Sequence, residues 1–141
     1  MYATLISFIK TQLQAVTQIA SGAVYDYPTS KLDKYPAVMF FPVSFENSFE
    51  SVKENFKIYR FKMFVVVGIA QKGKSDVFGT VLAGVVDAIL AKFDNAWDAG
   101  TISGHRAWMK IDSGDWAMVL SDNGQEAQAE LNVSIKVLTN N

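Results

Sequence analysis

The sequence has no cysteine and a single histidine, and both scarcities exclude particular chemistries. Without cysteine, the 141-residue chain offers no disulfide, no thiolate nucleophile and no cysteine-based zinc or iron–sulfur site. His105 is the only histidine, so one chain cannot supply two histidine ligands to a metal. A serine–histidine–aspartate arrangement likewise has no choice of base. Because its only charged neighbour is Arg106, we expect a structural or surface role for His105 rather than a catalytic one.

An excess of one charge and a long apolar run are also missing. The net charge of −1 argues against a protein whose main task is to grip nucleic acid electrostatically. The longest apolar run, residues 77–91, is shorter than the roughly 18 residues of a membrane helix and contains Asp87. The N-terminus has no basic lead-in of the kind that signal peptides carry. We therefore expect a soluble protein that is made and used in the cytosol.

The charges are unevenly divided along the chain. Residues 1–75 contain nine Lys/Arg and five Asp/Glu, whereas residues 76–141 contain four and nine. Such a division can bring identical subunits together through two different patches, although folding can equally intermix the two halves.

What is abundant is apolar and aromatic sequence, which predicts one well-filled domain over residues 1–141. Half of the residues are hydrophobic and 13% are aromatic. Periodicity and breakers predict the following elements in order: a helix over 2–20, strands over 24–27 and 37–45, a polar hairpin connection over 46–55, a strand over 57–69, a helix over 76–93, a loop over 94–104, and strands over 105–119 and 125–137. Pro42 predicts an edge strand or a bulge, and residues 113–115 offer a turn inside the strand that begins at His105.

These elements predict an α+β fold. One face of the last strand is apolar and the other is polar, which is typical of an antiparallel strand with one wet face. We expect a mainly antiparallel or mixed sheet of about five strands, with two α-helices packed on one face.

The eight residues from Gly68 to Ser75 match the phosphate-loop pattern G-x-x-x-x-G-K-[ST] and lie between a predicted strand and a predicted helix. In such a loop Lys74 would contact phosphate and Ser75 would bind magnesium. Three observations oppose a nucleotide site. Nucleotide-binding folds of this type use a parallel sheet that is buried on both faces, whereas the last predicted strand has one polar face. In addition, half of the chain precedes the loop, and no later apolar run ends in a magnesium-binding aspartate. A glycine-rich turn between a strand and a helix has the same sequence pattern, because glycine accepts the backbone conformations of such turns. We favour this interpretation.

The remaining polar and aromatic residues give no stronger chemical signal. The acidic residues near loops have no metal-loop spacing, so solvated charges explain them; they are Asp94, Asp98, Asp112, Asp115 and Asp122. Trp97, Trp108 and Trp116 lack the positive groove that accompanies a base-stacking platform, which favours core or subunit-contact roles. We expect no catalytic residue, no cofactor and no metal.

Five segments carry a resemblance to a known family: residues 1–13 with Met1, Tyr2, Leu5, Ile6 and Leu13; the sequence VYDYP at 24–28; YPAV at 35–38; ENFKIYRF at 54–61; and VDAILAKF at 86–93, followed by two long strands. Through these segments the chain resembles the tail terminator (tail completion) proteins of long-tailed, non-contractile bacteriophages. The resemblance covers nearly the whole chain in order. Related neck and minor tail proteins share much of the pattern, and a generic oligomeric binding module is a further alternative.

The resemblance implies two helices against a mixed sheet and assembly into a hexameric ring without catalysis. The ring caps the tail tube, stops its polymerisation and offers the docking surface for the head connector. It implies as partners the chain itself, the tail tube protein and the connector or neck protein. Genomic DNA would pass through the pore without sequence-specific binding, and no membrane is involved. The location is then the virion tail, assembled in the host cytoplasm.

The family has no motif that marks contact residues, so the interface is predicted from this sequence alone. Phe49 and Val52 are apolar residues in an otherwise polar hairpin, as expected of a contact arm that is buried only on assembly. Together with Glu50 and Lys53 they form the predicted subunit or tail-tube interface. The alternative is that Phe49 and Val52 fold back onto their own domain.

Overall fold

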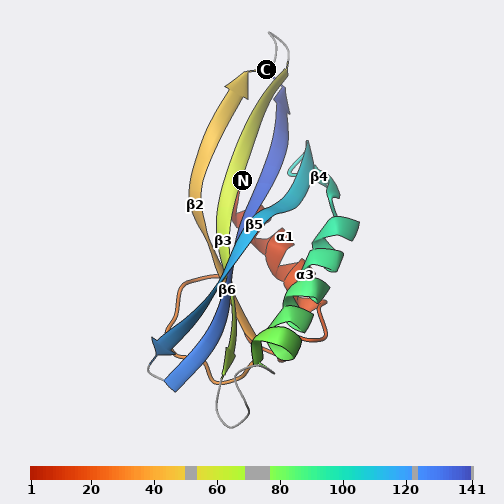
Figure 1. Cartoon of the computed structure of the whole chain (residues 1–141). Coiled ribbons are helices and arrows are strands. Elements are labelled where there is room, and N and C mark those ends of the chain that lie inside the picture. The colour runs from red at the N-terminus through yellow and green to blue at the C-terminus, as the bar shows by residue number, and fades with distance from the viewer. Residues whose placement is uncertain (50–53, 69–76, 122–123, 141) are drawn as a thin grey trace.

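Six strands form one mixed sheet in the part of the chain that the computed structural model describes, residues 1–49, 54–68, 77–121 and 124–140 (Figure 1). The sheet order is β1-β2-β3-β6-β5-β4. The strands are β1 (Val24–Tyr25), β2 (Ala37–Phe49), β3 (Glu54–Gly68), β4 (Asp98–Ile102), β5 (His105–Ser121) and β6 (Gly124–Asn140). Only β1 and β2 pair parallel; the other neighbours pair antiparallel. The predicted α+β class is confirmed, with one strand more than expected.

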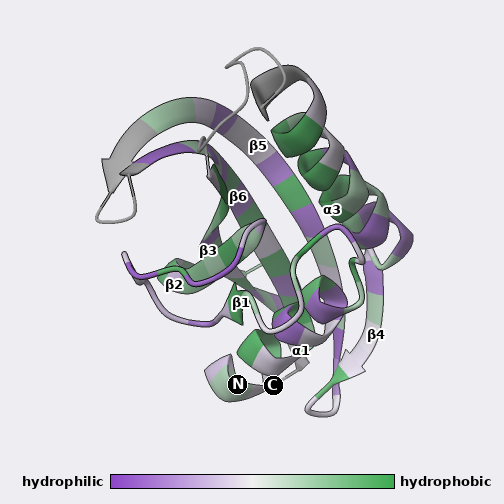
Figure 2. Ribbon diagram, turned by 90° about the horizontal axis from the view of Figure 1, so that it is seen from below, coloured by the Kyte–Doolittle hydropathy of each residue, from purple (hydrophilic) through white to green (hydrophobic). Residues whose placement is uncertain are grey.

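Two α-helices and a short π-helix accompany the sheet. They are α1 (Tyr2–Gln14), the π-helix η1 (Val77–Leu82) and α3 (Ala83–Asn95), which follows η1 directly. The helix α1 contacts β1 and α3, whereas α3 contacts β5, and η1 contacts β3 and β6. The two helices therefore lie together beside a strongly curved sheet rather than side by side on a flat one (Figures 1 and 2).

The helix predicted over residues 2–20 is too long, because α1 ends at Gln14 and turns follow. Leu5, Ile9 and Leu13 are fully buried at a spacing of four residues, as an amphipathic helix requires. Val16 and Ile19 follow at a spacing of three residues and are also buried, but they reach the core from the turns. Apolar periodicity alone could not separate these two cases.

The loop predicted over residues 94–104 is wrong in its second half, where β4 forms. Its glycines, which indicate a loop in the sequence, serve a bulge and a tight turn instead. Gly100 has a φ of 69° beside the register shift between Asp98 and Gly100, and Gly104 has a φ of 81° in the turn to β5. Glycine accepts both conformations without steric cost.

The polar segment predicted as a hairpin connection over residues 46–55 is mostly strand. β2 runs on to Phe49, and β3 starts at Glu54. This part of the hairpin projects beyond the helices, so polar residues can occupy both of its faces (Figure 1). The predicted irregularity at Pro42 is confirmed as a register shift between Pro42 and Ser44.

β5 also contains a register shift, between Ile111 and Ser113, but no turn interrupts it. Beyond this bulge Gly114 lies opposite Leu131. A Cβ atom on Gly114 would lie 2.7 Å from Cδ2 of Leu131, so only glycine fits here without a shift of that leucine. The interruption predicted at residues 113–115 is therefore a bulge within a continuous strand.

The core lies between the helices and one side of the sheet, which we call the helix side. On β3 it includes Tyr59, Phe61 and Met63, and on β6 it includes Val133 and Ile135, all at most 6% exposed. The ring of Tyr2 meets those of Tyr59 and Phe61 with centroid distances of 5.0 and 6.2 Å, which joins α1 to β3. None of the helices in the described ranges is long and apolar enough to cross a membrane.

Candidate functional site

Large apolar side chains are exposed on two arms at opposite ends of the sheet. The β2–β3 arm consists of residues 43–49 of β2 and 54–58 of β3, and it carries Phe49 (77% exposed) and Phe45 (58%). The β5–β6 arm consists of residues 114–121 of β5 and 124–129 of β6, and it carries Trp116 (52%) and Met118 (44%). Figure 1 shows the first arm at the top and the second at the lower left.

The register assigns Phe45 and Phe49 to the helix side. Directly opposed residues of an antiparallel pair point to the same side of the sheet. Phe45 lies opposite Tyr59, which packs against Tyr2 of α1, and Phe49 lies opposite Asn55 two pairs further along that side. Both phenylalanines therefore continue the core side of the sheet past the end of its helical cover.

Trp116 and Met118 lie on the helix side as well. They are opposite Ala129 and Ala127, which are buried, whereas they themselves are about half exposed. Small residues on β6 leave this part of the sheet open beyond α3.

A groove separates α3 from the β5–β6 arm. Its volume is about 290 Å³. Its lining comprises Val86 and Leu90 of α3, residues 111–116 of β5 including Trp116, and Ala129 and Leu131 of β6. The two charged residues in this lining, Asp112 and Asp115, are both acidic. Asp115 lies opposite Glu130, next to the pair of Gly114 and Leu131, so its side chain points away from the groove, and Asp112 pairs with Lys110 at 3.3 Å. The groove is therefore mainly apolar.

The opposite side of the sheet, which we call the outer side, is covered by paired charges. Arg60 meets Glu46 at 2.9 Å and Lys62 meets Glu130 at 2.7 Å, each pair joining neighbouring strands. A groove of about 540 Å³ crosses this side beside Arg60. Its charged lining residues are the cations Arg60, Lys110 and Lys136 and the single acid Asp112, so the lining is net positive.

Two further cations on the outer side lie over aromatic rings. Nζ of Lys136 is 4.1 Å from the ring centroid of Phe56, and the guanidinium of Arg106 is 5.3 Å from that of Trp108. The guanidinium of Arg106 also hydrogen-bonds Asp98, and the backbone N–H of Gly100 donates to that carboxylate. These donors, Arg106 first, lower the pKa of Asp98 below its ordinary value of 3.8.

Of the predicted interface residues, Phe49 lies at the end of β2 with its side chain in solvent. Glu50, Val52 and Lys53 lie outside the described residues. The exposure of Phe49 does not support the alternative in which it folds back onto its own domain.

The phosphate-loop motif falls largely outside the described part of the chain. Gly68 is the last residue of β3, and a Cβ atom there would lie 3.3 Å from two ring carbons of Tyr35. Close packing against that ring is sufficient reason for a glycine. β3 is antiparallel to both of its neighbours, unlike the strand that leads into a nucleotide-binding loop.

The other candidates for chemistry are dispersed. His105 begins β5 beside the tight turn from β4, and the described ranges contain no group of three or more His, Asp or Glu able to hold a metal ion. Trp97 and Trp116 are more than half exposed, and Trp108 lies on the outer side near Phe56. Of the two roles predicted for the tryptophans, core or subunit contact, the exposure of Trp97 and Trp116 excludes the core role, and the subunit-contact role stays a prediction.

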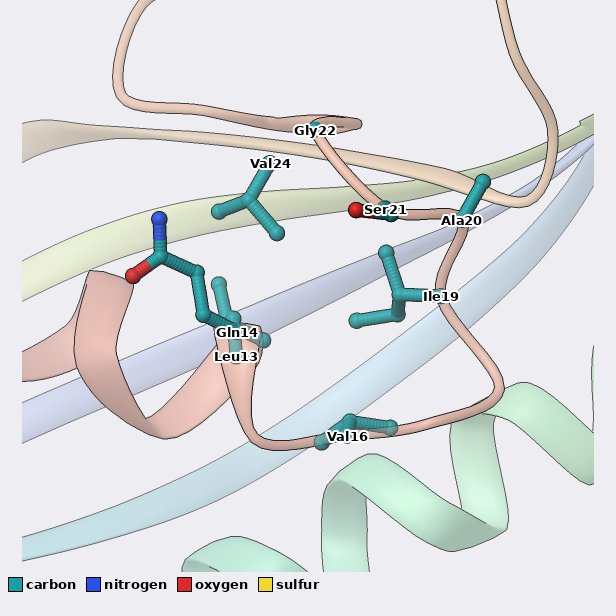
Figure 3. A pocket seen from close by; sticks show the side chains of 8 residues that line it. All are labelled: Leu13, Gln14, Val16, Ile19, Ala20, Ser21, Gly22 and Val24. Carbon is teal, nitrogen blue, oxygen red and sulfur yellow. The ribbon is translucent and has the colours of Figure 1, made fainter.

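A small pocket lies between the end of α1 and β1 (Figure 3). It measures about 260 Å³, and its lining is apolar except for Gln14 and Ser21. None of its eight lining residues is titratable, so the pocket lacks the groups needed for acid–base or nucleophilic work.

The sequence did not identify Phe45 and Met118 as members of an exposed surface, and it predicted a subunit contact for Trp116 only as an alternative to the core. The spacing of Phe45 and Phe49 was a usable signal, because residues four apart share one side of a strand. Trp116 and Met118 also share one side of a strand, but their exposure depends on how much of the sheet the helices cover, which the sequence does not show.

Comparisons with known proteins bear on the fold alone. No family model matches the sequence, and no curated protein matches it either. A solved structure, whose name states no function, matches with a TM-score of 0.52 at 12% identity, covering 96% of this chain and 92% of the other. The class that these findings define is an α+β domain with a curved mixed sheet.

Proposed function

We propose that this protein is a phage tail terminator: a structural subunit that forms a ring on the end of the tail tube. The resemblance noted above suggests the class. The observation that carries the proposal is the pair of exposed apolar surfaces on arms at opposite ends of one sheet, with Phe45 and Phe49 on one arm and Trp116 and Met118 on the other.

A ring of identical subunits needs two different surfaces on each subunit, because each copy meets its two neighbours through unlike patches. Exposed large apolar residues gathered in this way are typical of surfaces that are buried on assembly. One arm ends at residues 49 and 54, and the other at residues 121 and 124. Their placement at opposite ends suits contact with two different neighbours.

The proposed ring caps the tube of tail protein, stops further growth and presents a docking surface to the head connector or neck protein. DNA passes through its pore without sequence-specific contacts. The protein then has no substrate and no cofactor, and its place is the virion tail.

The test is assembly of the purified protein, alone and with tail tube protein. We expect native mass spectrometry and electron microscopy to show a closed ring, with six copies as the family resemblance implies. Added to polymerising tube protein, the ring should bind tube ends and limit tube length.

A protein that stays monomeric in both settings, or that leaves tube length unchanged, contradicts the proposal. A Phe45→Ser/Phe49→Ser double variant tests the role of this surface, since it removes apolar side chains that are largely exposed in the free subunit. It should fold normally and fail to assemble.

A further inference from the structure

The groove between α3 and β5 has room for an aromatic side chain. Its volume of about 290 Å³ is roughly twice the ~150 Å³ that holds a benzene molecule in an engineered protein cavity. Val86, Leu90 and Trp116 provide apolar walls, and Ala129 and Leu131 form the floor. A ring seated there would meet apolar atoms on several sides.

Phe45 and Phe49 are the most exposed phenylalanines of the described residues, but they cannot enter their own groove. Phe49 lies level with Thr139 of β6, because both pair with Asn55, whereas the groove lies at Ala129 and Leu131. At roughly 3.3 Å per residue along a strand, the two features are about 30 Å apart. The occupant must come from another molecule.

We propose that the groove receives the β2–β3 arm of a second copy of this chain. Phe49, with Phe45 behind it, seats between α3 and Trp116. This inference rests on the proposed function, since it names the surfaces that join one subunit to the next. The contact is head-to-tail, so an open row of subunits has a free arm at one end and a free groove at the other until the ring closes.

The area available is appropriate for such a contact. At roughly 200 Å² per fully exposed aromatic side chain, Phe45 (58% exposed) and Phe49 (77%) present about 270 Å². One partner in a standard interface contributes about 800 Å², of which roughly 450 Å² is apolar. The two phenylalanines thus supply more than half of the apolar surface that one side requires, and their clustering fits the anchor residues of an interface.

Site-specific crosslinking tests the contact directly, because the natural chain has no cysteine. Asn47→Cys on the arm and Asp87→Cys on α3, combined in one chain, should give a ladder of covalent oligomers with a short bis-maleimide. Each single variant should give none. The matched control combines Asn47→Cys with Lys31→Cys, an exposed position in the loop after β1, and it should also give no ladder.

The affinity between subunits provides a second measurement. Phe49→Ser should raise the dissociation constant of the subunits roughly thirtyfold or more, as loss of an anchor residue does.

The outcomes separate this inference from the function on which it rests. A natural chain that remains monomeric by native mass spectrometry overturns the proposed ring. If the natural chain forms rings but the Asn47→Cys/Asp87→Cys variant gives no ladder, or Phe49→Ser leaves the affinity unchanged, only the arm-in-groove contact is overturned.

Discussion

Among individual residues, Glu126 stands out as a carboxylate that is only 2% exposed. The hydroxyl of Tyr35 donates a hydrogen bond to its Oε2 atom over 2.5 Å, which ties the segment before β2 to the start of β6. A buried charged group is costly unless it is hydrogen-bonded. This contact therefore fixes the position of the Tyr35 ring, against which Gly68 also packs.

We predict that Tyr35→Phe lowers the free energy of unfolding by about 1–3 kcal/mol, because the buried carboxylate loses a donor. Urea denaturation measures the change. Tyr27→Phe is the matched control, since the ring of Tyr27 is half exposed and its change should stay within about 0.5 kcal/mol. Equal effects of the two variants would show that the hydrogen bond to Glu126 contributes no stability.

Asp98 gives a prediction for the dependence of stability on pH. Its folded-state pKa lies below the ordinary value of 3.8, chiefly because Arg106 donates to the carboxylate. The stabilisation is therefore present above pH 3.8 and is lost as the pH falls through that value toward the lower folded-state pKa.

Asp98→Asn should make the protein slightly less stable at neutral pH, and the difference from the natural chain should shrink at acid pH. Thermal unfolding over a pH series measures it. Asp94→Asn is the control, because Asp94 is exposed and has no ion-pair partner in the part of the chain that the structure describes. A difference that grew on acidification would contradict the assignment.

Among the elements, α1 depends on three fully buried side chains, Leu5, Ile9 and Leu13. Ile9→Ala should destabilise the protein by about 2–5 kcal/mol, since it removes buried methyl groups and leaves a cavity. Ser7→Ala, on the exposed side of the same helix, should change stability by no more than about 0.5 kcal/mol. Chemical denaturation followed by circular dichroism compares them, and a loss below 1 kcal/mol for Ile9→Ala would show that α1 contributes little to the core.

The accuracy of element prediction from sequence depended on whether local pattern or distant packing decided the structure. The stripe of α1 and the alternation of β6 are local, and both elements were predicted. The turns between α1 and β1 could not be predicted, because the burial of Val16 and Ile19 depends on distant segments. The strand β4 could not be predicted either, because Gly100 indicates a loop until its pairing with β5 is known. Residues 46–55 of the β2–β3 hairpin are predicted as a polar connection although most of them form strand, because a hairpin with polar residues on both sides resembles a loop in sequence.

At the scale of the whole molecule, the α+β class could be predicted, because helix and strand periodicities are both strong. The candidate interface could be predicted in part. Phe49 stood out as an apolar residue in a polar segment, and the structure gives it 77% exposure. The groove could not be predicted, because it brings together Leu90, Trp116 and Ala129 from three elements whose relative positions only the folded chain defines.

The central position of β6 has a consequence for how the protein is made. β6 lies between β3 and β5 and pairs with both along most of its length, with Glu54 opposite Asn140 and Ser121 opposite Gly124. As the ribosome synthesises the chain from its N-terminus, the β1-β2-β3 and β4-β5 parts of the sheet have no strand to join them until β6 emerges. Pairing across such sequence separations slows folding. The nascent chain therefore keeps apolar strand surface exposed until β6 has emerged, and a chaperone has its main opportunity to bind during that interval.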